Sequence, residues 1–258
     1  MQNREGRARP PHQCQVAHHE DFGPGEDTIS RSPGALTAPR PDSARAATAE
    51  LPPARLPWSR LKRTFDVLFA VVALLALVPL LVIIAVAIKL DSRGPLLFRQ
   101  RRYGRGMRDF TVLKFRTMVP GARADLHRQY IAVLARAGED VDGLKKLTDD
   151  PRVTRVGSVL RRFSLDELPQ LVNVLTGHMS LIGPRPAIGY ELEHYRPRHF
   201  ERFEVRPGLS GLWQVSGRNE VGFTEMLDLD VEYARNCTFT TDLRVFVRTP
   251  FAMVRGAA

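Results

Sequence analysis

The stretch VLFAVVALLALVPLLVIIAVAI, residues 67–88, is an apolar run without a single charge and with one proline, Pro79, near its middle. At 1.5 Å per residue a helix of this length spans about 33 Å, which is enough for the hydrocarbon core of a bilayer. A chain that carries one such segment beside a large polar remainder is expected to work at a membrane, and its substrate can be there too.

The excess positive charge of the chain lies next to this run. The 258 residues have a formal net charge of +10, to which residues 1–57 contribute zero and residues 58–118 contribute +9. A nucleic-acid-binding protein more often spreads its basic groups over the folded domain. Clustering beside an apolar segment indicates attraction to anionic lipid head groups instead. We therefore expect anionic membrane lipids, and no nucleic acid, as partners.

Basic residues stand on both sides of the run, and two topologies are compatible with them. They are Arg55, Arg60, Lys62 and Arg63 before it, and Lys89, Arg93, Arg99, Arg101, Arg102, Arg105 and Arg108 after it. A spanning helix would place one cluster outside the cytoplasm, against the positive-inside tendency, although the stronger downstream cluster can dominate. A helix that enters, bends at Pro79 and returns would keep both clusters on one face, since proline can bend a helix. The residues alone leave both topologies open.

The parts of the chain on either side of the run differ in composition. Residues 1–57 hold nine of the nineteen prolines and show no period, which predicts a disordered tail without a signal peptide. Downstream we expect one compact domain of about 200 residues. Cys14 and Cys237 are isolated, so they predict neither a disulfide framework nor a metal motif.

The downstream part is predicted to be mostly helical, with one short β-hairpin. Strands are expected at 96–100 and 110–115, helices at 122–137, 153–162, 168–175, 224–236 and 243–255, and a loop at 138–150. The helix at 243–255 intersperses apolar side chains with arginines, so it either lies at a membrane interface or packs on the core of the domain. The predicted fold class is α+β.

The strongest candidate for chemistry is RRFSLDELPQ, residues 161–170. At a helix N-terminus the adjacent carboxylates of Asp166 and Glu167 can both reach one polar pocket, where one attacks a phosphorus atom and the other holds Mg²⁺. The alternative is a capping box, in which Ser164 and Glu167 satisfy free N–H groups at the start of the helix. The local pattern by itself favours the capping box.

Two further segments combine arginine with glycine and proline. They are GHMSLIGPRP at 177–186 and VRPGLSGLWQVSGRN at 205–219. Such segments let the backbone approach a phosphate and hold a guanidinium in place, although each alone can be an ordinary turn. Together with the carboxylate pair they indicate an anionic phosphate ligand. Asp228, Asp230 and Glu232 alternate in a later helix and are expected to form a solvated face with one or two residues turned inward.

In their order along the chain, these segments resemble the bacterial sugar transferase family, the monotopic phosphoglycosyl transferases. The resemblance covers residues 62–255, nearly everything outside the tail. It is carried by Lys62-Arg-Thr-Phe-Asp66, Lys114-Phe-Arg-Thr-Met118, Ser164-Leu-Asp-Glu-Leu-Pro-Gln-Leu171, Ser180-Leu-Ile-Gly-Pro-Arg-Pro186, and Val205-Arg-Pro-Gly208 through Gly217-Arg-Asn219.

The resemblance implies an enzyme that moves a phosphosugar from a UDP-sugar to polyprenyl phosphate and releases UMP. The reaction would initiate surface polysaccharide or glycoconjugate synthesis at the cytoplasmic face of the bacterial inner membrane. Asp166 would form a covalent phosphosugar intermediate, and Glu167 would help to place Mg²⁺. The remaining implied site residues are Arg161, Arg185 and Arg206 near phosphates, and Asp230 near the active site.

The resemblance also implies a re-entrant helix-break-helix with the break at Pro79. The expected organisation is then a tail at 1–57, a membrane-inserted segment at 58–92 and a catalytic domain with interfacial helices at 93–258. Two positions depart from the family pattern: His178 stands where Asp is frequent, and Val78 stands where Ser often precedes the proline. Neither the sugar nor the oligomeric state follows from the sequence.

Two other functions are compatible with the same motifs. A membrane-tethered scaffold or regulator would keep the fold without turnover. A Mg²⁺-dependent membrane phosphohydrolase would release sugar phosphate without a lipid acceptor.

Overall fold

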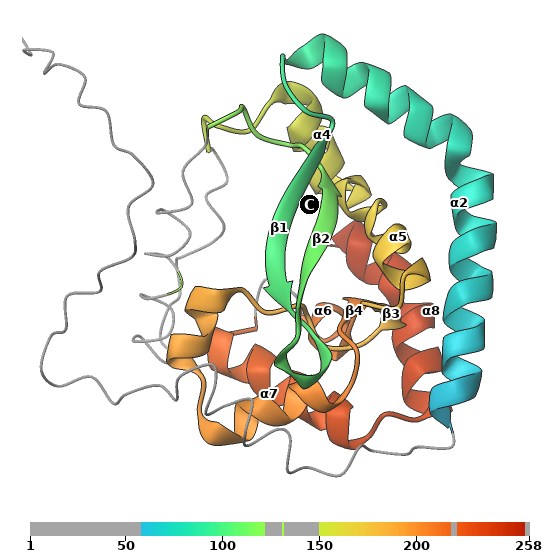
Figure 1. Cartoon of the computed structure of the whole chain (residues 1–258), viewed down its shortest axis with the longest axis vertical. Coiled ribbons are helices and arrows are strands. Elements are labelled where there is room, and N and C mark those ends of the chain that lie inside the picture. Colours follow the sequence, from blue (N-terminus) through green and yellow to red (C-terminus); the bar gives the residue numbers. More distant parts are fainter. Residues whose placement is uncertain (1–57, 122–130, 132–149, 218–220, 256–258) are drawn as a thin grey trace, which may run out of the picture. The chain divides into compact units, whose positions relative to one another are not determined.

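The computed structural model describes residues 58–121, 131, 150–217 and 221–255. The predicted tail at 1–57 lies outside these ranges, as do almost all of the helix predicted at 122–137 and of the loop predicted at 138–150. The described residues combine helices with two small sheets (Figure 1). This confirms the predicted α+β class with its short hairpin.

Helix α2, Trp58–Asp91, contains the whole apolar run. It ends just before Gly94, whose φ of 131° is incompatible with a helix, and before a proline. The helix is continuous through Pro79 and curves along its length (Figure 1). An 18-residue window within Arg60–Asp91 has a mean hydropathy of 3.3 and is only 11% buried. Helix α2 is therefore a candidate for membrane association.

The predicted hairpin consists of strands β1, Leu97–Tyr103, and β2, Asp109–Phe115, which pair in antiparallel orientation. A short 3₁₀ turn joins them, in which Gly106 has a φ of 62°. The register pairs Phe98 with Lys114 and Arg102 with Phe110. Because successive side chains of a strand alternate between faces, Arg102 and Lys114 lie on the same face of the hairpin.

The remaining helices largely follow the predicted ones. They are α4, Arg155–Arg162; α5, Gln170–Leu175; α6, Leu212–Val215; α7, Phe223–Arg235; and α8, Phe239–Arg255. Helix α5 begins two residues later than predicted, because a separate 3₁₀ turn precedes it. Helix α8 begins four residues earlier than predicted. The short helix α6 was not predicted.

A second sheet was not predicted either. Strands β3, Ser180–Ile182, and β4, Gly208–Ser210, form a two-stranded parallel pair. Glycine is required beside it, because a Cβ on Gly183 would lie 2.4 Å from the carbonyl oxygen of Arg206. Two 3₁₀ helices, Gly189–His194 and Pro197–Glu204, connect β3 to β4.

One side of α2 packs on the rest of the described domain. Near its beginning Ala70 belongs to a buried cluster with Val112 and Val174. Towards its end Ile84 and Ile88 belong to another cluster, which includes Phe115 and Leu160. The other side of α2 exposes large apolar residues along its length. The helix is thus both part of the hydrophobic core and an apolar surface.

The motif Lys62-Arg-Thr-Phe-Asp66 attaches the beginning of α2 to the domain. Lys62 forms a 2.7 Å ion pair with Asp242 of α8, and Asp66 accepts a 2.8 Å hydrogen bond from the hydroxyl of Ser180. Arg63 donates to the last two carbonyl groups of α5. Each polar side chain of this motif except Thr64 therefore has a partner far away in the sequence.

Candidate active site

The adjacent carboxylates lie in a single 3₁₀ turn, Leu165–Glu167, between α4 and α5. The turn is entered through Ser164, which has a left-handed φ of 54°. The side chain of Ser164 makes no capping hydrogen bond there. The capping-box alternative is therefore wrong, because a residue in this conformation does not present its hydroxyl to the N–H groups of the next turn.

A lysine of the hairpin brings the two carboxylates together. The Nζ atom of Lys114 lies 2.7 Å from Oε1 of Glu167 and 3.8 Å from Oδ2 of Asp166. The side chains of Asp166 and Glu167 are 13% and 33% exposed. Both acids therefore face one cation in a partly solvated site, as a reaction on a phosphate group requires.

The ionisation of Asp166 depends on its charged neighbours. Burial raises the pKa of its carboxyl group, and the adjacent charge of Glu167 raises the pKa further. Lys114 and Arg161 act in the opposite direction and favour the carboxylate. The two cations therefore widen the pH range in which Asp166 is a carboxylate.

Arg161 projects from the end of α4 and is held at one of its nitrogens. Its Nε atom donates a 2.9 Å hydrogen bond to Oγ1 of Thr117, which follows β2. Helix α4 can come this close because residue 157 is a glycine; a Cβ there would lie 2.1 Å from the carbonyl oxygen of Thr117. The terminal nitrogens of Arg161 have no hydrogen-bond partner among the residues that the structure describes. They remain available for an anion.

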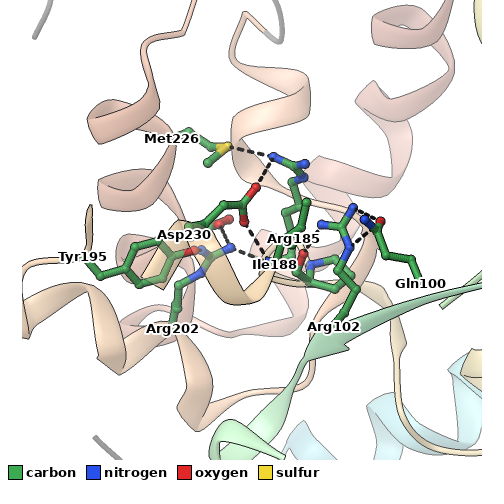
Figure 2. A network of polar contacts seen from close by, with 10 residues as sticks. Gln100, Arg102, Arg185, Ile188, Tyr195, Arg202, Met226 and Asp230 are labelled. Carbon is green, nitrogen blue, oxygen red and sulfur yellow. Dashed lines mark hydrogen bonds and ion pairs between the residues drawn. The ribbon is translucent and has the colours of Figure 1, made fainter. Parts of the chain in front are cut away.

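Arg185 lies in the loop after β3, in a network of polar groups (Figure 2). Its Nη1 atom is 3.5 Å from a carboxylate oxygen of Glu191 and 3.9 Å from the sulfur of Met226. The side chain is 24% exposed, whereas that of Glu191 is buried. Arg185 is therefore a charged group at the edge of a buried network.

Asp230 of α7 lies inside the same network and is fully buried. Its Oδ2 atom forms a 2.5 Å ion pair with Arg202. Burial raises the pKa of Asp230 to about 6, although the charge of Arg202 opposes this. As predicted for the alternating acids of this helix, one is turned inward, while the side chain of Asp228 is 42% exposed. Asp230 has no surface with which to touch a ligand.

Arg206 lies apart from the dyad of Asp166 and Glu167. Its Nε atom donates a 3.0 Å hydrogen bond to the carbonyl of Gly177, beyond the C-terminal end of α5. The dyad precedes the N-terminal end of that helix. Burial and the nearby charges of Arg105 and Arg63 lower the pKa of Arg206. The structure thus brings Asp166, Glu167 and Arg161 together, and Arg206 lies at the other end of α5.

His178, which departs from the family pattern, also lies at that other end. Its ring stacks on Phe110 at a centroid distance of 5.7 Å, and its Nδ1 atom lies 2.8 Å from the hydroxyl of Thr176. Neither contact reaches the dyad.

Several residues of the site were not predicted from the sequence. Lys114 and Thr117 belong to a motif that carried the resemblance, so the signal was present, but no role followed from it. Arg102 was counted only among the basic residues that flank the apolar run. Arg202 had no signal, since a single arginine in an irregular segment indicates nothing by itself.

The described residues hold no group of three or more His, Cys, Asp or Glu that could bind a metal ion. Mg²⁺ needs fewer protein ligands, since one or two carboxylates together with phosphate oxygens suffice. The dyad fits that smaller requirement, because Glu167 keeps a third of its side chain exposed.

Comparison with known proteins identifies the family of the chain. The bacterial sugar transferase family matches residues 58–256. The chain is 43% identical over 188 residues to the exopolysaccharide production protein ExoY of Sinorhizobium fredii, a match covering 73% of this chain and 83% of that protein. It is 40% identical over 197 residues to the undecaprenyl-phosphate galactose phosphotransferase of Salmonella typhimurium, covering 76% of this chain and 40% of that protein.

A third relative is the UDP-glucose:undecaprenyl-phosphate glucose-1-phosphate transferase of Caulobacter vibrioides. The chain is 38% identical to it over 242 residues, which cover 90% of this chain and 78% of that protein. A family match over most of the chain, together with relatives of this similarity, is decisive. The chain belongs to the bacterial sugar transferase family and is a phosphoglycosyl transferase.

Proposed function

We propose that this enzyme transfers a phosphosugar from a UDP-sugar to polyprenyl phosphate and releases UMP. The names of two relatives mention undecaprenyl phosphate, and one of them also names UDP-glucose, which supports this reaction. The observation that carries the proposal is the pair of Asp166 and Glu167 facing Lys114 in a partly solvated site. Surface polysaccharide or glycoconjugate synthesis would begin with this step.

In the proposed first step a carboxylate oxygen of Asp166 attacks the β-phosphorus of the nucleotide sugar. A new O–P bond forms, the bond from this phosphorus to the oxygen of UMP breaks, and UMP leaves with the electron pair. In the second step an oxygen of polyprenyl phosphate attacks the same phosphorus and displaces Asp166 as a carboxylate. Lys114 and Arg161 keep Asp166 ionised and offer positive charge to the phosphate oxygens.

We include Mg²⁺ in the proposal. Glu167 would hold the ion together with phosphate oxygens of the substrate, and the ion would supply neutralisation of their charge. Lys114 already contacts Glu167, so the lysine and the ion would share the negative charge of the dyad.

We further propose that α2 is re-entrant and places the dyad at the cytoplasmic face of the inner membrane. Support comes from the basic residues at both ends of α2, from the curvature of the helix (Figure 1) and from Pro79 within it. Helix α8 adds an interfacial surface: Phe239, Leu243, Val247 and Phe251 recur every four residues and are all exposed. Such a stripe is suited to the boundary between head groups and acyl chains.

The catalytic proposal is tested with the variant Asp166→Asn. We expect UMP release from a UDP-sugar, with polyprenyl phosphate present, to fall by at least about 1000-fold, because the amide is not a nucleophile. Asp228→Asn is the matched control, since this aspartate is exposed and pairs with Arg198 away from the dyad. Unchanged turnover of Asp166→Asn would remove Asp166 from the nucleophile role.

The same assay separates the alternatives. A scaffold would show no turnover with any UDP-sugar and would tolerate changes in both dyad residues. A phosphohydrolase would release sugar phosphate in the absence of polyprenyl phosphate.

Topology has its own test. A single cysteine at residue 40 and another at the exposed Arg162 should both react with a membrane-impermeant reagent from the cytoplasmic side only. Labelling of residue 40 from the opposite side would show that α2 spans the membrane.

A further inference from the structure

The buried network contains three arginines, Arg102, Arg185 and Arg202. They differ in how many of their guanidinium nitrogens donate hydrogen bonds to the protein. Each of the three guanidinium nitrogens of Arg102 donates a hydrogen bond, and Figure 2 shows this side chain next to Gln100. Its Nε and Nη2 atoms donate to the side-chain oxygen of Gln100 at 3.0 and 2.7 Å, and its Nη1 atom donates to the carbonyl of Pro186 at 2.8 Å. Arg102 is buried. Its guanidinium is therefore committed to the protein itself.

Both terminal nitrogens of Arg202 are used in a similar way, whereas its Nε atom is buried and has no hydrogen-bond partner among the described residues. Its Nη1 atom donates to the hydroxyl of Tyr195, and its Nη2 atom donates to the carbonyl of Arg185 and to Oδ2 of Asp230, both at 2.5 Å. Arg202 and Asp230 are both buried. Two buried arginines thus hold two successive backbone carbonyls, those of residues 185 and 186. Backbone pairing of Tyr103 with residue 187 holds the next position of this loop.

Arg185 is the exception in the network. Within the described part of the chain its side chain reaches only the Glu191 carboxylate and the Met226 sulfur, both beyond 3.4 Å. Its backbone is held tightly, and its side chain is the only one of the three that is not buried. A group that is fixed at its base and unsaturated at its tip is suited to bind a ligand.

We propose that Arg102, Arg202 and Asp230 are positioning residues, which hold the loop 184–187 so that Arg185 meets an anionic part of the nucleotide sugar. This inference rests on the proposed function. It assigns Asp230 a role through Arg202 and the loop, and none in contact with substrate. Buried polar groups with this many backbone contacts restrict a loop to one conformation.

The loop lies along the same hairpin as the dyad. Arg102 and Lys114 share one face of the hairpin, and their register positions are four residues apart, or roughly 14 Å at 3.4 Å per residue. The charge of Glu167 reaches Arg102, since it raises the pKa of that arginine, which burial and Arg185 lower to about 10. The side chain of an arginine and an extended nucleotide sugar can bridge such a distance.

A double-mutant cycle tests the inference. We expect Arg185→Ala alone to lower kcat/KM for the UDP-sugar by about 10- to 100-fold, mainly through KM, because a charge-assisted contact is lost. Arg202→Met should lower it by a similar factor. If Arg202 acts through Arg185, the double variant should be hardly worse than either single variant. Multiplicative losses would overturn the inference.

Arg63→Met is the matched control, because Arg63 also binds two successive backbone carbonyls, but at the far end of α5. The effect of Arg63→Met on kcat/KM should multiply with that of Arg185→Ala. If these two effects are also non-additive, the coupling between Arg202 and Arg185 reflects a general loosening of the fold. If Arg202→Met does not fold, Arg102→Gln takes its place in the cycle. Absence of turnover in the wild-type enzyme would refute the proposed function, whereas full activity of Arg185→Ala would refute only the present inference.

Discussion

The dyad turn and the buried arginine network use the same chemistry, cations beside carboxylates, for opposite purposes. At the dyad Lys114 faces Asp166 and Glu167, and all three side chains keep some contact with solvent. In the network Arg202 and Asp230 are almost without exposure. A partly solvated pair can exchange its partner for a substrate, whereas a fully buried pair cannot, because separating it leaves an uncompensated charge. Exposure therefore distinguishes the groups that we propose to react from those that we propose to position the loop.

The largest effect on stability is expected from breaking the buried pair. Arg202→Met leaves Asp230 without its cation and should reduce the free energy of unfolding by about 3–5 kcal/mol. Chemical denaturation in detergent micelles measures this change. A loss below about 1 kcal/mol would show that the network contributes as little as a surface pair, which would remove the distinction between the two regions.

At the dyad a change should affect activity more than stability. Lys114→Met should lower kcat by about 100-fold, because one positive group that faces the reacting phosphate is lost. The unfolding free energy should change by less than about 1 kcal/mol, since Lys114 is partly exposed. A variant that unfolds readily but retains kcat would reverse the comparison.

The acidic limb of the pH–activity profile, where kcat falls as the pH is lowered, tests the same role of Lys114. Lys114 lowers the pKa of Asp166, so its removal should raise that pKa, and activity should be lost at a higher pH than in the wild type. Lys114→Arg keeps the charge, and its limb should stay near that of the wild type. Measuring kcat from pH 4 to pH 8 for the three proteins decides this, and an unmoved limb in Lys114→Met would argue that Asp166 is not the titrating group.

Asp230 should give the network a pH dependence of stability. Burial raises its pKa from 3.8 to about 6 in the folded protein. The folded state therefore binds this proton more tightly than the unfolded chain, and the stabilisation is present at low pH and lost as the pH rises through about 6. The unfolding free energy of the wild type, relative to that of Asp230→Asn, should fall between pH 4 and pH 7. Parallel profiles for the two proteins would contradict this.

The smallest effect is expected at the surface. Arg101 and Asp109 form a 2.7 Å ion pair near the turn of the hairpin, with side chains that are 74% and 37% exposed. Arg101→Ala should change the unfolding free energy by about 0–1 kcal/mol, because solvent screens the pair. Equilibrium denaturation of Arg101→Ala and Arg202→Met, measured side by side, compares the two ion pairs. Equal losses of unfolding free energy in both variants would mean that burial is not what distinguishes the pairs.

The sequence predicted the parts of the fold whose signals are local. The apolar run, the hairpin and the helices α4, α7 and α8 came from period, charge and turn residues. The strands β3 and β4 were missed because three residues show no period. Helix α8 was predicted to begin too late because its first turn consists of threonines and aspartate after Phe239, which are weak helix formers.

The candidate site divides in the same way. Asp166 and Glu167 could be found from their neighbours in one motif, and Arg161 from the same segment. The role of Lys114 could not be predicted, because it lies 53 residues before the glutamate that it contacts. Asp230 was expected near the active site, but its burial and its pairing with Arg202, 28 residues earlier, required the folded chain.

By itself, the sequence determined the family, located the apolar helix and predicted the dyad, because these depend on residue type and on short spacing. Only the tertiary structure decided how each arginine is used. A guanidinium next to a glycine or a proline has the same chemistry in every motif. Whether it binds a ligand or holds a loop depends on which backbone carbonyls the fold brings within its reach. Arg102 and Arg202 each donate to a carbonyl of one loop. Among the residues that the structure describes, the terminal nitrogens of Arg161 have no hydrogen-bond partner, and Arg185 makes only contacts of 3.5 Å and 3.9 Å.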